Sequence, residues 1–332
     1  MQDKAKCRWQ SAASHAGRAD WLLLVLPGLI WGASFLFIAE GMRAIGPNGV
    51  TFLRILIGFG TLSLFPAARK PILRSDWVGT VGLGVMWLAF PLSMFPLAER
   101  HVSSALTGML NGANPLFTAI VAAVIARQTP SRRVFAGLAI GMAGAMLMAL
   151  SASSGDHTSA AGIGMIVAAL VSYGLALNIA APLQRRNGAL PVIWRAQAVA
   201  LILAAPLGLH DLVGARWILG PVVALLALGA LGTGAAHVVM SVAAGRFGAT
   251  TASATTYLIP GVALALGVVV RHEKVTLLSV AGSAVCIAGA WMLRRAQSPG
   301  EVRGMIFLQS RRPLLRDSKF LSLCPGTSRG EE

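Results

Sequence analysis

The chain has 332 residues, of which 55% are hydrophobic and only 12% charged, and its formal net charge is +16. Soluble domains carry about 25% charged residues, so this composition excludes a water-soluble fold, and the mean hydropathy of +0.70 indicates an integral membrane protein. The positive charge is typical of loops that face anionic lipid. We expect no nucleic-acid partner, because that would need a soluble domain or a long basic arm, which only the C-terminal tail could supply.

Ten apolar stretches long enough to cross a hydrocarbon layer of about 30 Å follow one another along the chain. In chain order they are Trp21–Ala39, Gly49–Ala67, Trp77–Leu97, Val102–Ile125, Val134–Leu150, Ala160–Ala181, Leu190–Leu209, Trp217–Ala243, Ala249–Val270 and Val275–Leu293. Each is expected to be a helix, because an apolar segment in lipid cannot leave its amides unpaired and barrel strands would alternate in polarity. The predicted fold class is an all-α integral membrane protein with ten transmembrane helices.

The chain also contains an internal repeat. The small-residue stretch 136–145 matches 281–290 at an offset of 145 residues, and the same offset carries Pro115 onto Pro260. Five spans per unit is an odd number, so the two units enter the membrane from opposite sides and form inverted repeats, as in many secondary transporters. The expected division is an N-terminal tail at 1–20, repeat 1 at 21–150, a polar linker at 151–159, repeat 2 at 160–294 and a basic, disordered tail at 295–332.

Basic residues predict the orientation. Before the C-terminal tail, thirteen Lys and Arg residues fall in one set of loops and five in the alternate set. The positive-inside rule places the richer set, and with it both termini, in the cytoplasm, so we expect a multi-pass protein of the plasma (inner) membrane. A cleaved signal peptide is the competing interpretation of the first span, but its apolar region is longer than the 7–15 residues of a signal peptide.

Short motifs recur in order along both halves: Ile30-Trp31-Gly32-Ala33-Ser34-Phe35, Phe52-Leu53-Arg54, Asn114-Pro115-Leu116-Phe117, Tyr173-Gly174, Trp194-Arg195 and Leu258-Ile259-Pro260-Gly261. Together they resemble the drug/metabolite transporter superfamily in its EamA-like branch. The resemblance covers about Trp21 to Leu293. It implies two inverted five-helix repeats, export of small organic metabolites or drugs by alternating access, and a cavity lined by spans 1, 3, 4, 6, 8 and 9. Many members have a Gly-Glu pair after span 4; here Arg127-Gln128 stands there, and the second copy reads His272-Glu273.

Charged residues inside spans are few. All twelve acidic residues lie in tails, loops or span ends, so we expect no carboxylate proton relay within the bilayer. Arg54 and Arg195 each lie about five residues, or roughly 7 Å, inside a span. They either extend to the headgroups or act as gates that attract an anionic or zwitterionic substrate.

Two spans combine polar side chains with a proline that breaks the helix and frees backbone carbonyls. Such sites bind substrate in transporters, although the polar groups could instead hydrogen-bond between helices. The substrate-binding candidates here are Asn111, Asn114, Thr256 and Tyr257, with helix breaks at Pro115 and Pro260.

Interior aromatic residues form a second group of candidates. Trp31, Trp87 and Tyr173 could stack against an organic substrate or serve only in packing. Asn178 is polar and central in its span. His237, the only histidine within a span, is the candidate for proton coupling, with a purely structural role as the alternative.

These observations predict a secondary transporter with no catalytic residues. No Walker loop is present, and the three cysteines are far apart, so we expect no ATP hydrolysis, cofactor or metal. The expected partners are a small-molecule substrate, anionic lipid headgroups at the basic loops and, as a candidate assembly, a homodimer. The alternatives are a non-transporting membrane scaffold or assembly factor and an integral membrane lipid-modifying enzyme.

Overall fold

The computed structural model describes residues 18–127, 129, 131–152, 159–247 and 253–296. The expected N-terminal tail 1–20, linker 151–159 and disordered tail 295–332 lie mostly outside the described residues; of the described positions, 18–20, 151–152 and 295–296 are helical. Within the described part every regular element is helical, which confirms the all-α fold class.

The described helices form ten consecutive rods, and two short 3₁₀ turns, η1 (Pro66–Arg69) and η2 (Arg74–Asp76), join the second rod to the third. The rods are α2 (Arg18–Gly41), α3 (Pro47–Ser63), α4–η3–α5 (Trp77–Leu83, Gly84–Ala89, Phe90–Ala98), α6–α7 (Ser104–Asn111, Asn114–Ala126), α8 (Arg132–Ala152), α9 (Ala160–Asn187), α10 (Ala189–Leu212), α11–η4–α12 (Leu219–Ala227, Leu228–Ala235, Ala236–Phe247), η5–α14 (Ser253–Leu258, Ile259–Arg271) and α15 (Leu277–Ala296). By length and apolarity five helices could each cross a membrane, or six if the bent pair α6–α7 counts as one span, and three shorter apolar helices accompany them.

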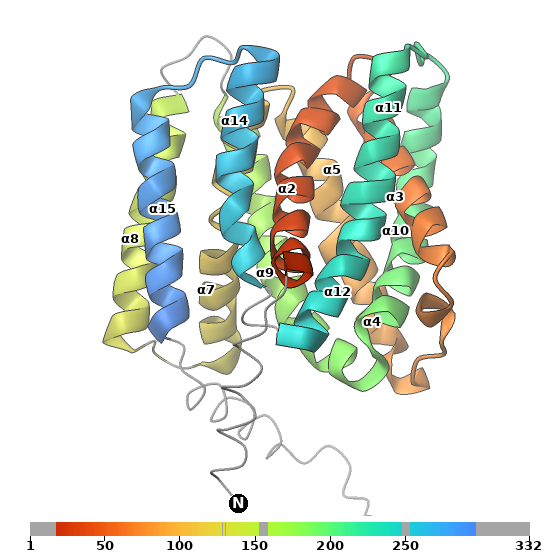
Figure 1. The fold of residues 1–332 in the computed structure, drawn as a ribbon, viewed down its shortest axis with the longest axis horizontal. Coiled ribbons are helices and arrows are strands. Elements are labelled where there is room, and N and C mark those ends of the chain that lie inside the picture. Colours follow the sequence, from red (N-terminus) through yellow and green to blue (C-terminus); the bar gives the residue numbers. More distant parts are fainter. Residues whose placement is uncertain (1–17, 128, 130, 153–158, 248–252, 297–332) are drawn as a thin grey trace, which may run out of the picture.

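The two repeats run in opposite directions through the bundle (Figure 1). The first helix of repeat 1, α2, ends beside the end of α14, where Arg271 pairs with Glu40 at 2.9 Å. The first helix of repeat 2, α9, begins on that same face, where the Ser159 N–H donates to the His101 carbonyl. We call this end of the bundle the upper face and the opposite end, where α4 begins and α9 ends, the lower face.

The repeated small-residue stretches meet each other. Helices α8 and α15, which carry them, lie side by side at one edge of the bundle (Figure 1). A Cβ on Gly282 would lie 2.8 Å from the Gly144 carbonyl oxygen, and one on Gly289 would lie 2.7 Å from that of Gly137. Glycine therefore lets the two backbones touch, as small residues do between membrane helices.

The repeats also share their irregularities. Each has a π-helical segment in the middle of its third rod, η3 in repeat 1 and η4 in repeat 2. Each turns out of its fourth rod through a non-glycine residue in the left-handed region, Arg127 with φ 52° and His272 with φ 55°, which the 145-residue offset superposes. Segments of π-helix are uncommon and often mark functional positions, so η3 and η4 direct attention to the middle of the bundle.

Candidate substrate site

The segment η4 is the point where three other spans attach. The Trp31 indole N–H of α2 donates to the Gly232 carbonyl at 3.0 Å. The Arg54 Nε–H of α3 donates to the Thr233 hydroxyl at 3.2 Å, and the Gln197 amide of α10 donates to the Thr233 carbonyl at 2.7 Å. Irregular winding leaves carbonyls without a partner in their own helix, and here side chains from both repeats bind them.

Arg54 is buried at this point. Its residue is only 5% exposed, so the side chain does not extend to the headgroups. Within the described part of the chain it forms no ion pair, although Tyr173 and Glu99 lie within electrostatic reach. A guanidinium has five N–H donors, and a buried charge without a counter-ion is costly, so this group is suited to bind an anion.

Aromatic rings form contacts that begin beside the same segment, at Trp31 and at His237 just after η4. The His237 ring lies edge-on to Trp31 at 5.6 Å and to Trp87 at 6.1 Å between ring centroids. The Nδ1 atom of His237 is buried and has no hydrogen-bond partner among the described residues. Tyr173 packs on Phe95 at 5.9 Å. The rings of α2, η3 and α12 thus form an apolar surface with one polar nitrogen available.

The break between α6 and α7 carries two further unpaired polar atoms. The helices bend by 40° directly before Pro115, and the side-chain carbonyl oxygens of Asn111 and Asn114 are buried without partners in the described structure. Gly112 lies against the second helix break, since a Cβ there would be 2.5 Å from Pro260 Cγ. Buried polar atoms without partners are rare in native proteins and indicate a place for water or a ligand.

Two of the predicted site residues are bound within the helix bundle. The Asn178 amide donates to the carbonyls of Gly174 at 2.8 Å and of Thr118 at 3.1 Å. The Tyr257 hydroxyl donates to the Ala290 carbonyl at 3.0 Å and so connects η5 to α15. These contacts hold α9 against α7 and η5 against α15.

The two predicted arginines have different surroundings. Arg195 is partly exposed, and its guanidinium lies 5.4 Å and 5.8 Å from the ring centroids of Trp194 and Trp77. Unlike Arg54, it lies among aromatic rings at the margin of the bundle, where cation–π contact stabilises the charge. Thr256 lies half-buried on η5, close to the second helix break.

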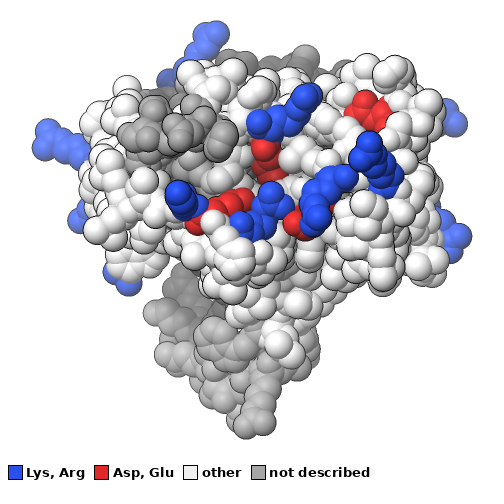
Figure 2. Space-filling model, turned by 90° about the horizontal axis from the view of Figure 1, so that it is seen from above, with Lys and Arg blue, Asp and Glu red and all other residues white. Residues whose placement is uncertain are grey.

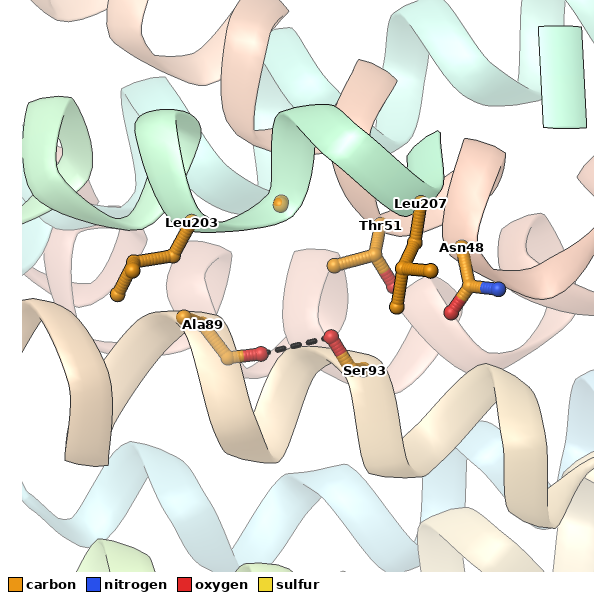
Figure 3. A pocket seen from close by; sticks show the side chains of 7 residues that line it. Asn48, Thr51, Ala89, Ser93, Leu203 and Leu207 are labelled. Atoms are coloured by element: carbon orange, nitrogen blue, oxygen red, sulfur yellow. Dashed lines mark hydrogen bonds between the residues drawn. The ribbon is translucent and has the colours of Figure 1, made fainter. Parts of the chain in front are cut away.

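One small, partly open pocket is lined by other residues (Figure 3). It has a volume of about 60 Å³ and lies between α3, α10 and the junction of η3 with α5, where the Ser93 hydroxyl donates to the Ala89 carbonyl at 2.8 Å. Small-molecule pockets are typically 300–1,000 Å³, so this space suits a few water molecules and not a metabolite. It is lined by Asn48, Thr51, Ala89, Ser93, Leu203, Ala204 and Leu207, none of which the sequence singled out.

Three residues of interest were not predicted from the sequence. Thr233 is a small residue in a run of glycine, alanine and leucine, and only the π-helical segment around it gives it several partners. Gln197 is a fully buried amide within a span, and that isolated polarity was a usable signal. Glu99 lies at the end of α5, where its sequence position suggested a loop residue in water, but its carboxylate oxygens are buried.

The chain is similar to proteins of a known transporter family. The model of the EamA-like transporter family matches residues 20–150 and again 160–295. A probable terminal-alkyne amino-acid exporter of Streptantibioticus cattleyicolor is 26% identical over 84% of this chain and 94% of its own length. An uncharacterized transporter of Bacillus subtilis is 26% identical over 78% and 86%, and a probable amino-acid metabolite efflux pump of Salmonella typhimurium is 24% identical over 83% and 94%.

Fold and sequence agree on the classification. A solved crystal structure aligns with a TM-score of 0.56 and 20% identity over 84% of this chain and 99% of the other, which shows the shared fold. The family match covers both five-helix halves of the bundle. The chain therefore belongs to the EamA-like transporter family, as its motifs indicated, and is a multi-pass membrane transporter of small molecules.

Proposed function

We propose that this transporter exports small organic metabolites that carry a carboxylate, and that Arg54 binds the carboxylate. The observation that carries the proposal is the buried Arg54 guanidinium, which is fixed by the neutral Thr233 hydroxyl and has no ion-pair partner among the described residues. A substrate carboxylate would supply the missing charge through bidentate hydrogen bonds. Two relatives named for amino-acid export support this class of substrate.

The rest of the substrate would lie against the rings. Trp31, Trp87 and Tyr173 offer flat apolar surface, and in an amino-acid derivative an ammonium group would lie over a tryptophan face. The unpaired oxygens of Asn111 and Asn114 are acceptors for the N–H groups of the same ligand. Residues of both repeats would take part, so rocking of one repeat against the other would alternately expose the substrate.

The proposed orientation follows from charge. The lower face carries the positive-rich loops, so both termini would be cytoplasmic in the plasma membrane and the upper face extracellular. A groove of about 450 Å³ at the lower ends of α8 and α15 is lined by Arg132, Arg133 and Arg295, and Arg295 also lies 3.8 Å from the Trp291 ring centroid. Anionic lipid headgroups would bind there.

Flux in proteoliposomes tests the proposal. The probes are radiolabelled neutral amino acids, an aromatic amino acid, a nucleoside and a cationic dye. We expect carboxylate-bearing probes to move and R54Q to reduce their flux at least about 30-fold, since a buried charge-assisted contact is worth about 2 kcal/mol or more. R54K should recover part of the loss because it keeps the charge but not the planar donor geometry.

The matched control is R195Q, which removes the other arginine within a span and should leave flux within about twofold, because Arg195 lies apart from the site. If folded R54Q transports carboxylate probes as fast as the wild-type protein, the assignment of Arg54 is overturned. A folded wild-type protein that moves none of the probes would count against this substrate class altogether.

A further inference from the structure

Charged groups gather on an otherwise mostly uncharged upper face (Figure 2). The centre of the cluster is Arg271 at the end of α14, which pairs with Glu40 of α2 at 2.9 Å and with Glu273 at 3.2 Å. Glu273 also accepts hydrogen bonds from the Ser104 N–H at 3.1 Å, the Ser104 hydroxyl at 2.6 Å and the Ala105 N–H at 2.8 Å, at the start of α6. This network, which we call the upper latch, ties α2 and α6 of repeat 1 to α14 of repeat 2.

One carboxyl beside the upper latch takes no part in it. Glu99 lies at the end of α5, and both of its carboxylate oxygens are buried without a hydrogen-bond partner among the described residues. A carboxylate in that state would bear the full cost of desolvation, whereas a protonated, neutral carboxyl would not. This burial favours the protonated form of Glu99 when the latch is closed.

The charged groups that face Glu99 come from two directions. Glu273 and Arg271 lie on the side of the latch and Arg54 on the side of the substrate site, with Arg271 already shared with Glu40. Burial, and secondarily the neighbouring Glu273 carboxylate, raise the pKa of Glu99 well above its ordinary value, against the opposing effect of the two arginines. The adjoining Arg100 is exposed to solvent.

We propose that Glu99 is a proton-binding site that controls the upper latch: the protonated residue permits closure, and loss of the proton opens it. Once ionised, Glu99 attracts both arginines that face it, Arg54 and Arg271, and so competes with Glu40 and Glu273 for Arg271. Arg271 cannot satisfy three carboxylates in one arrangement, so the connection between α2 and α14 weakens and the ends separate. Water then reaches Glu99 and solvates its charge.

The pH dependence has a defined sign. Glu99 binds its proton more tightly in the closed latch, where it is buried, than in an open one, where water would return its affinity to the ordinary range. Closure therefore takes up a proton and is favoured at low pH. In the pH range between the pKa of Glu99 in the open latch and its higher pKa in the closed latch, the ratio of open to closed molecules should rise up to about tenfold per pH unit.

Distance measurement tests this without any substrate and without assuming an orientation. Spin labels are attached to R43C and K274C, both at exposed positions on the upper face, in a full-length chain whose three native cysteines are replaced, in nanodiscs. We expect a short separation at pH 5.5 and a growing population of longer separations at pH 8.5. E99Q, which stays neutral, should keep the short separation at both pH values.

The variant E99D provides the matched control, because it restores a titrating group and should restore the response. It also keeps the test informative if E99Q folds poorly. A pH response that persists in folded E99Q, or a parent protein and E99D whose distances do not change between these pH values, would overturn the proposal. Neither result depends on whether Arg54 binds a carboxylate.

Discussion

The two ends of the bundle are closed by different ion-pair networks. At the lower face, the buried Asp76 accepts a hydrogen bond from the Asn187 amide at 2.6 Å and pairs with Arg186 at 2.8 Å. Asn187 in turn accepts from the Leu73 N–H at 2.8 Å. At the upper face, Arg271 serves two carboxylates while Glu99 remains without a partner. In the lower network the buried Asp76 carboxylate is paired, whereas the upper face leaves one buried carboxyl, that of Glu99, without a partner, although Glu40 also pairs with Arg43.

This difference shows how two similar-looking charge clusters can have different roles. A network whose groups are all satisfied has one favoured arrangement and rigidifies the segments that it joins. A network with a surplus buried carboxyl has a second arrangement that a single proton can select. We therefore expect the lower network to act mainly on stability and the upper latch on both stability and conformation.

The largest effect is expected for E273A. It leaves the Ser104 and Ala105 donors at the start of α6 without an acceptor and removes one partner of Arg271. Because unpaired buried donors cost about 1–3 kcal/mol each, the free energy of unfolding in mixed micelles should fall by about 2–4 kcal/mol. E273Q keeps an acceptor oxygen and should lose about half as much. Equal stability of E273A and the parent protein would contradict the latch.

A smaller effect is expected for D76A at the lower face. It removes the acceptor for Asn187 and the partner of Arg186, and we expect a loss of about 1–2 kcal/mol in the same unfolding measurement. R186A is the control, because the Arg186 side chain is 54% exposed and should contribute less than about 0.5 kcal/mol. The distance between the spin labels on the upper face should not change in D76A. A change would show that the two ends of the bundle are coupled, which contradicts their separate roles.

The smallest effect is expected for R43A. Its pair with Glu40 spans one helical turn at 2.9 Å, but the Arg43 side chain is 67% exposed. Exposed pairs of this kind contribute less than about 0.5 kcal/mol and are screened by salt. The loss should therefore be small at low salt and vanish near 1 M salt. A fall in the free energy of unfolding of more than about 1 kcal/mol would instead show that Arg43 belongs to the upper latch.

The sequence alone predicted most of the fold but only part of the candidate site. The repeated glycine stretches indicated close helix packing, and α8 and α15 show that contact between the repeats. The π-helical segments were not foreseen, because no short pattern specifies extra winding within an apolar span. The role of Thr233 depends on η4 and so could not be predicted from the sequence. Arg54, which donates to Thr233, and Trp31, which donates to the neighbouring Gly232, were both predicted as candidate site residues.

The acidic residues show the same limit. Their positions in tails, loops and span ends predicted no carboxylate proton relay within the bilayer, because a loop in sequence is normally solvated. Glu99 and Glu273 are also at span ends, yet the folded chain buries the Glu99 carboxylate oxygens and makes Glu273 the acceptor for the start of a helix 169 residues earlier in the chain. Burial is set by neighbours that are distant in sequence, so position along the chain could not reveal it.

The sequence by itself determined the membrane character, the helices and their duplication, because hydrophobic length and unpaired amides leave a chain in lipid few alternatives. Only the tertiary structure decided which polar groups meet. It placed Arg54 beside Thr233, gave Arg195 different neighbours, and buried the Glu99 carboxylate oxygens without a hydrogen-bond partner. The physical reason is that helix formation depends on local chemistry, whereas the state of a buried charge depends on every group packed around it.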